Sequence, residues 1–249
     1  NSLINLNPEI KKEPALVDEV LFKLEDIINS SREIGLVKAN EELFKWLCGE
    51  RSMPFGKNNQ HIPIKLIDFD NLSNNSFIIT NQFKIQHSEL KIPDIVMMIN
   101  GFPIVVGEAK TPIRPSISWV DGAHEIHDIY ENAVPQLFVP NILSFATEGK
   151  ELFYGGVRTP LQYWSPWRIN EDKNDLVKKL NLGEVGEELV DLLSPEKLLD
   201  ILKNFSLFST NKKKQRSKII CRFQQYEGAN KIVERVVEGK EKKGLIWHF

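Results

Sequence analysis

Apolar residues near the start of the chain recur at helical spacing. Leu16, Val20 and Leu24 lie four residues apart, which places them on one face of a helix. The pattern therefore predicts a helix over residues 14–30, and the proline that opens it suits a first turn. A second stretch of the same kind predicts a helix over residues 37–48.

Alternating or continuous apolar runs predict strands in the middle of the chain. Residues 62–69 and 77–85 have this character, and the turn-forming sequence NLSNNS lies between them. Two further strands, residues 94–99 (DIVMMI) and 103–110 (PIVVGEAK), are joined by Asn100-Gly101, a strong hairpin signal. Both faces of these two strands are apolar, because apolar residues occupy odd and even positions alike. We therefore expect the hairpin at the centre of a sheet that is covered on both faces.

The pattern after this hairpin returns to a helix and then to strands. Residues 121–133 predict a helix that Pro135 ends, because the residue before a proline avoids helical geometry. Residues 142–147 and 152–157 predict two more strands around a glycine turn.

A change of pattern near residue 170 predicts a domain boundary. Residues 1–170 are predicted to form an α/β domain, with a mixed central β-sheet flanked by helices. Residues 171–218 predict a helical connector that ends in a basic loop, and a last helix is expected over residues 219–237.

Composition narrows the class of protein. The 249 residues are 41% hydrophobic and 27% charged, which is typical of a soluble globular chain that can bury a core. The chain has no apolar run long enough for a membrane span, and its first residues lack the basic, apolar, small-residue order expected of a signal peptide. Its two cysteines exclude a disulfide framework. We therefore expect a cytoplasmic, reduced protein.

Positive charge is concentrated in one segment, although the net charge is only −2. Between Lys203 and Arg222 the sequence has seven basic residues and no acidic one. Such a block forms either a solvated loop or a strip that contacts phosphates, and the block alone does not decide between them. The residues that would contact nucleic acid are Lys212, Lys213, Lys214 and Arg216.

The candidate chemistry lies at the ends of the predicted hairpin. Glu108 and Lys110 project from one face of their strand, because strand side chains repeat every two residues. Whether Asp94 joins them depends on the register. A strict two-residue turn at Asn100-Gly101 places Asp94 on the opposite face, whereas a three-residue loop or a bulge places it directly across from Glu108.

Charged side chains at the edge of a buried sheet need a partner. Carboxylates there cost several kcal/mol unless they are paired or bind a metal. Two carboxylates suit Mg²⁺, and a nearby lysine can position a water and offset developing charge, which are the needs of phosphodiester hydrolysis. The simpler alternative is an ion pair of Glu108 with Lys110 beside a turn-capping Asp94.

The stretch KIPDIVMMINGFPIVVGEAKTP resembles the PD-(D/E)xK nuclease motif of the restriction (R) subunit of type I restriction–modification enzymes. The resemblance extends upstream through PIKLIDFDNLSNNSFIITNQFKI and downstream through VPQLFVPN. It continues in LVDLLSPEKLLDILKNFSLF and CRFQQYEGANKIV, so that it covers most of the chain from about residue 40. It implies a Mg²⁺-dependent endonuclease domain followed by the start of a RecA-like motor domain over residues 219–249.

The resemblance also assigns roles to individual residues. Asp94 and Glu108 would be metal ligands together with the carbonyl of Ala109, and Lys110 would be the catalytic lysine. The family usually has Gln-x-x-x-Tyr in the following helix, whereas the residue four before Tyr130 is an isoleucine. Either Glu125 takes that role with the alignment shifted by one residue, or this chain lacks the motif.

Several other residues have weaker assignments. Glu42 or its neighbour Glu41 could approach the metal from the second helix, although a solvated helix face is the simpler interpretation. The tryptophans at 119, 164 and 167 could stack on bases or pack in the core. The pair His124 and His127 lacks the i, i+4 spacing of a zinc protease.

The end of the chain resembles the region that precedes a motor domain. Gln225 would contact adenine, and the tail KKGLIWHF resembles the strand that leads into a phosphate-binding loop. A Walker A sequence does not occur in these residues. We therefore expect part of a longer protein. The resemblance implies that the complete protein uses ATP and acts on duplex DNA with methyltransferase (M) and specificity (S) subunits. A stand-alone repair nuclease and a DNA-binding or assembly module with an inactive nuclease site remain alternatives.

Overall fold

A computed structural model describes residues 2–55, 58, 60–113, 116–169, 181–240 and 243–245 of the chain. The α-helices are α1 (Ser2–Leu6), α2 (Pro14–Asn29), α3 (Leu36–Leu47), α4 (Trp119–His124), α5 (Glu131–Ala133), α6 (Pro135–Phe138), α8 (Glu184–Leu192), α9 (Pro195–Asn204) and α10 (Phe223–Glu238). The strands are β1 (Ser52–Phe55), β2 (Gln60–Pro63), β3 (Phe77–Asn81), β4 (Ile85–Gln86), β5 (Leu90–Lys91), β6 (Ile95–Ile99), β7 (Phe102–Ala109), β8 (Leu143–Thr147), β9 (Leu152–Gly155), β10 (Ser165–Pro166), β11 (Ser206–Thr210) and β12 (Arg216–Ile220).

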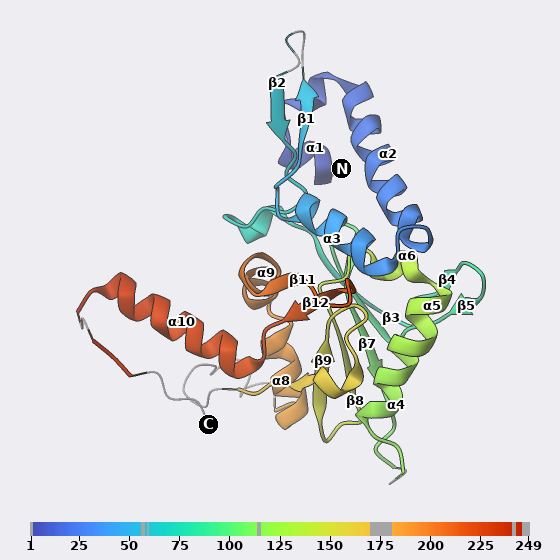
Figure 1. Cartoon of the computed structure of the whole chain (residues 1–249), viewed down its shortest axis with the longest axis vertical. Coiled ribbons are helices and arrows are strands. Elements are labelled where there is room, and N and C mark those ends of the chain that lie inside the picture. Colours follow the sequence, from blue (N-terminus) through green and yellow to red (C-terminus); the bar gives the residue numbers. More distant parts are fainter. Residues whose placement is uncertain are drawn as a thin grey trace.

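The central sheet is mixed, and its strand order is β10-β9-β8-β7-β6-β3. Only β7 and β8 pair in parallel; the other neighbours in this sheet are antiparallel. The helices between β7 and β8 form the crossover that a parallel pair requires, and α4 lies along these strands in Figure 1. The predicted mixed sheet with flanking helices is confirmed, whereas the described residues do not contain a RecA-like motor domain.

Both faces of the sheet are closely covered at β7 and β8. Every residue of β8 is buried. On one face a β-carbon at Gly122 of α4 would lie 3.2 Å from that of Ala146, so the helix backbone sits directly on the sheet. On the other face a β-carbon at Gly107 would lie 2.1 Å from the ring of Phe145, so only glycine fits there. The predicted central position of the hairpin is confirmed.

The two N-terminal helices agree with the hydrophobic pattern. Leu16, Val20 and Leu24 are the buried residues of α2, and α3 has a buried face of its own. The predicted strand over residues 62–69 is wrong beyond Pro63, although Ile64, Leu66 and Ile67 are buried. The physical reason is that the Asn7 side chain takes both backbone groups of Lys65, through two 2.7 Å hydrogen bonds.

The basic segment forms a β-hairpin and not an open loop. β11 and β12 pair from Ser206–Ile220 to Thr210–Arg216, and they leave a tight turn at residues 211–215. The predicted helix from Ile219 is therefore wrong at its start, because Ile219 pairs with Leu207. Helix α10 begins at Phe223 and extends away from the sheet in Figure 1.

Two predictions about the chain's organisation fall partly or wholly outside what the structure describes. The expected strand over KKGLIWHF lies largely outside the described residues, and residues 243–245 are neither helix nor strand. The boundary near residue 170 falls at the start of the gap 170–180 and stays a prediction. Within the described ranges, none of the helices combines the length and the apolar character that a membrane crossing requires.

Candidate active site

The register of the β6–β7 hairpin brings Asp94 and Glu108 together. Ile95 pairs with Gly107, so one further step along the same register sets Asp94 directly across from Glu108. The turn itself has two residues, Asn100 and Gly101, which both have positive φ angles (52° and 91°). A turn of this kind alone would have placed the two carboxylates on opposite faces.

A β-bulge corrects the register. Met98 pairs with Pro103 but Met97 pairs with Val105, so Ile104 is the extra residue of β7. The carbonyl oxygen of Ile104 accepts a hydrogen bond of 2.7 Å from the amide of Ile142 at the entry to β8. Of the alternatives that the sequence left open, the bulge is the one the structure contains.

The carboxylate of Asp94 is held by hydrogen bonds from two sides. One oxygen accepts the backbone N–H of Ala109 at 3.0 Å, and the other accepts the side-chain amide of Gln82 at 2.7 Å. Gln82 has a positive φ angle of 51°, and its backbone N–H donates a hydrogen bond of 2.9 Å to the backbone carbonyl of Asp94. Sequence reasoning gave Gln82 no role, and its place within the stretch PIKLIDFDNLSNNSFIITNQFKI, which carries part of the family resemblance, was the only signal.

Glu108 is the buried member of the cluster. The residue is 4% exposed, and burial raises the pKa of its carboxyl to about 7 against the opposing influence of Lys110. Its Oε1 accepts a hydrogen bond of 2.8 Å from the Lys110 amine. Its Oε2 is buried and has no hydrogen-bond partner among the described residues, which leaves one carboxylate oxygen available to a ligand.

Lys110 lies between two carboxylates. Its amine contacts Glu108 and also Glu125, which belongs to the helical segment above the sheet. Burial lowers the pKa of this amine, but the hydrogen bonds to Glu108 and Glu125 outweigh it, so the pKa is raised overall. Glu125 also accepts a hydrogen bond of 2.8 Å from the hydroxyl of Tyr130. Burial is the largest cause that raises the Tyr130 pKa.

The donor set at this edge of the sheet fits a hard divalent cation. In the part of the chain that the structure describes, no three His, Cys, Asp or Glu side chains gather to hold a metal by themselves. Mg²⁺ does not need such a group, because it binds through one or two carboxylates and keeps several waters. The unpaired Oε2 of Glu108, opposite Asp94, is the observation that favours a cation here.

Comparison with known proteins gives the family. The model of the family "Type I restriction enzyme R protein N terminus" matches residues 1–163. The chain belongs to this family. The HindI endonuclease subunit of the type I restriction enzyme of Haemophilus influenzae is 28% identical over 253 residues, which cover 98% of this chain and 23% of that protein. The putative MjaVIIIP endonuclease subunit of Methanocaldococcus jannaschii is 32% identical over 194 residues, covering 75% of this chain and 18% of that protein. The chain thus spans about a quarter or less of the length of these relatives.

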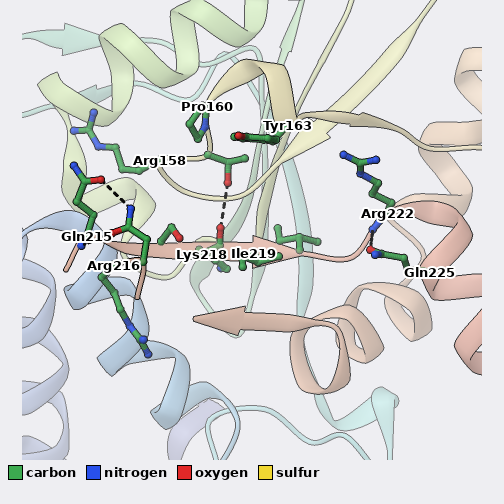
Figure 2. A pocket seen from close by; sticks show the side chains of 13 residues that line it. Arg158, Pro160, Tyr163, Gln215, Arg216, Lys218, Ile219, Arg222 and Gln225 are labelled. Atoms are coloured by element: carbon green, nitrogen blue, oxygen red, sulfur yellow. Dashed lines mark hydrogen bonds between the residues drawn. The ribbon is translucent and has the colours of Figure 1, made fainter. Parts of the chain in front are cut away.

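Four basic residues of this R-protein N-terminal chain line a groove of about 720 Å³, to which the cluster of Asp94, Glu108 and Lys110 does not contribute: Arg158, Arg216, Lys218 and Arg222 (Figure 2). The groove runs between the segment with Arg158 and Tyr163 and strand β12, and among the described residues no acidic side chain lines it. Arg216 lines it but pairs with Glu41, with Nε donating to Oε2 at 2.7 Å. The lysines at 212, 213 and 214 are exposed in the turn between β11 and β12.

Gln225 lies at the other end of the groove (Figure 2). Its side-chain oxygen accepts the backbone N–H of Arg222 at 2.9 Å, which caps the start of α10. This explains locally why the helix begins after Arg222. A role of Gln225 in nucleotide binding stays a prediction.

The remaining candidates are not brought into the carboxylate cluster. Glu42 forms ion pairs with Lys45 and Arg51 on its own side of the molecule. Trp164 and Trp167 are 5% and 0% exposed, so they pack in the core. Trp119 is partly buried and stacks on Phe153, with ring centroids 3.9 Å apart.

Proposed function

We propose that this chain is the DNA-cleaving part of a type I restriction enzyme and hydrolyses phosphodiester bonds of duplex DNA with Mg²⁺. The observation that carries the proposal is the bulged register, which sets Asp94 across from Glu108 at the strand end next to Lys110. Family membership and the names of the relatives support it.

Each residue of the cluster has a part in this chemistry. Asp94 and Glu108, with the carbonyl of Ala109, would hold the cation. When bound, Mg²⁺ would lower the pKa of a water and offset charge on the phosphoryl group. Lys110 would orient that water and stabilise the charge that develops on the phosphate oxygens. The hydrogen bonds from Gln82 and Ala109 fix the direction of the Asp94 carboxylate, as outer partners of metal ligands do.

The wider setting of the activity is also a proposal. The complete protein would use ATP to translocate DNA before it cleaves, in the cytoplasm, as part of a complex with methyltransferase and specificity subunits. Lys212, Lys213, Lys214 and Arg216 would contact phosphates without reading the base sequence. Gln225 would contact adenine only when the following motor domain is present.

The decisive experiment uses the complete protein assembled with its partner subunits. Asp94→Asn, Glu108→Gln and Lys110→Met should each lower DNA cleavage by about 10²-fold or more, while ATP hydrolysis is kept. Asp128→Asn is the matched control, because this carboxylate pairs with His124 and His127 on the nearby helix. Cleavage at the wild-type rate by any of the three variants would contradict the assignment. Cleavage that needs no ATP would favour a stand-alone nuclease.

A further inference from the structure

The helix that follows the site contains one turn of unusual geometry. Between α4 and α5 the backbone forms the π-helical turn η4 (Glu125–Tyr130), in which the amide of Glu131 donates to the carbonyl of Ile126. Such a turn holds one residue more than an α-helical turn. The π-turn therefore behaves as an insertion of one residue into an otherwise continuous helix.

The extra residue decides which side chains share a face. In an α-helix, residues four apart lie on the same face, whereas residues five apart do not. Here Glu125 and Tyr130 are five apart, and their side chains are joined by a hydrogen bond of 2.8 Å. Ile126, which is four before Tyr130 and would face it in a regular helix, is completely buried in the core.

Glu125 connects this helix to the lysine of the strand. One carboxylate oxygen accepts from Tyr130 and the other contacts the Lys110 amine. Lys110 also donates to Glu108, so two of its three N–H bonds point at fixed acceptors. The direction of the third N–H is thereby set, on the side of the amine away from both carboxylates.

We propose that Glu125 is a positioning residue for Lys110 and that the π-turn exists to place it. Held by Tyr130, Glu125 restrains the amine at the end of a flexible four-carbon chain, so that its free N–H points at the reacting phosphate or water. The inference rests on the proposed nuclease function. A misplacement of about 1 Å at such a group costs about 10²-fold in rate.

The test compares two variants that remove the same charge. Glu125→Ala loses both contacts, whereas Glu125→Gln keeps an amide that can bond with Lys110 and Tyr130. In the complete protein with its partner subunits, kcat for cleavage should fall about 10²-fold in Glu125→Ala, and KM for DNA should be unchanged. In Glu125→Gln, kcat should stay within about threefold of the wild-type value.

Metal binding supplies a second measurement that does not depend on cleavage. Calcium ions are titrated calorimetrically without ATP, and the signal of the Asp94→Asn/Glu108→Gln double variant is subtracted. Because the two Glu125 variants change the local charge equally, their Ca²⁺ affinities should agree within about twofold. Equal kcat in the two variants, or loss of Ca²⁺ binding in Glu125→Ala alone, would overturn the positioning role.

A deletion tests the π-turn itself. Removing Ile129, which is 47% exposed, leaves Glu125 and Tyr130 four apart and should convert the turn to regular α-helix. This variant should melt cooperatively and cleave within about tenfold of the wild type, because the same contacts form. The matched control removes Leu21, which is 45% exposed in the regular helix α2, and should unfold the N-terminal helices because Leu24 rotates out of the core. A folded Ile129 deletion that cleaves no DNA would contradict the role given to the turn.

The outcomes separate this inference from the proposed function. If Asp94→Asn abolishes cleavage and Glu125→Ala does not, the nuclease assignment stands and the positioning role is wrong. If Asp94→Asn cleaves at the wild-type rate, the function itself is wrong.

Discussion

The amine of Lys218 donates a hydrogen bond of 2.6 Å to the carbonyl oxygen of Asn141, across 77 residues of sequence. Lys218 is 2% exposed, and its amine lies 5.8 Å from the ring centroids of both Phe44 and Phe208. The β11–β12 hairpin is therefore anchored to the sheet domain by a buried lysine. Arg216, two residues earlier on the hairpin, adds an ion pair with Glu41 of α3.

Burial of Lys218 predicts a dependence of stability on pH. Burial lowers the pKa of this amine to about 7 in the folded protein, whereas an unfolded chain has the ordinary lysine value of about 10.4. Between these values the unfolded state binds one more proton, so the free energy of unfolding rises with pH. Relative to that of Lys218→Met, the free energy of unfolding of the wild type should rise by on the order of 1 kcal/mol per pH unit from pH 7 to 10.

Urea unfolding of both proteins at several pH values measures this difference directly. Methionine is a suitable replacement because its side chain has a similar volume to that of lysine and does not titrate. In Lys218→Met the carbonyl of Asn141 still accepts the hydrogen bond of 2.9 Å from the Asn40 side chain. If the free energy of unfolding changed with pH in the same way for both proteins, the Lys218 amine would have the same pKa in the folded and the unfolded state.

Gln82 should matter for metal affinity although it is not a ligand. Its amide fixes the Asp94 carboxylate through a 2.7 Å hydrogen bond, and loss of such an outer partner typically costs 10- to 100-fold in affinity. We expect Gln82→Ala to weaken Ca²⁺ binding by about tenfold or more. Gln86→Ala, at an exposed position of β4, should leave the calorimetric titration unchanged.

The exposed lysine turn should contribute to DNA affinity without affecting the chemical step. Replacing Lys212, Lys213 and Lys214 by Ala should weaken binding to duplexes of any sequence. It should also reduce the slope of log affinity against log salt by up to about 2.7, since each phosphate contact contributes about 0.9. A variant with Ala at the exposed residues Lys11, Lys12 and Lys23 controls for the change of net charge. Equal salt slopes in the two triple variants would show that the turn makes no phosphate contact.

Local pattern explains much of what the sequence predicted correctly. The β6–β7 hairpin could be predicted because Asn100-Gly101 favours positive φ angles, and Glu108 and Lys110 share a face by the strand period alone. The register could only be left open, because no residue type marks the bulge at Ile104. The extra residue makes a tertiary contact that no local pattern shows: the Ile104 carbonyl accepts a hydrogen bond from the amide of Ile142, far along the chain.

The other errors have similar causes. The strand predicted over residues 62–69 fails because the Asn7 side chain takes the backbone hydrogen bonds of Lys65. The helix predicted from Ile219 starts late because Ile219 and Ile220 pair with β11. The π-turn has no sequence signature, so only the family motif gave a reason to suspect the shift of one residue between Glu125 and Tyr130.

The hydrogen bonds of the carboxylate cluster and the contacts that anchor the β11–β12 hairpin differ in sequence separation. Asp94 and Ala109 are 15 residues apart, as are Lys110 and Glu125, and Gln82 is 12 from Asp94. The anchoring contacts span 77 and 175 residues. Short spans cost little loop-closure entropy, and domains emerge from the ribosome N-terminus first. On a growing chain, the carboxylate cluster can therefore assemble before the basic hairpin has been synthesised, so that the hairpin docks onto a sheet whose catalytic edge is already built.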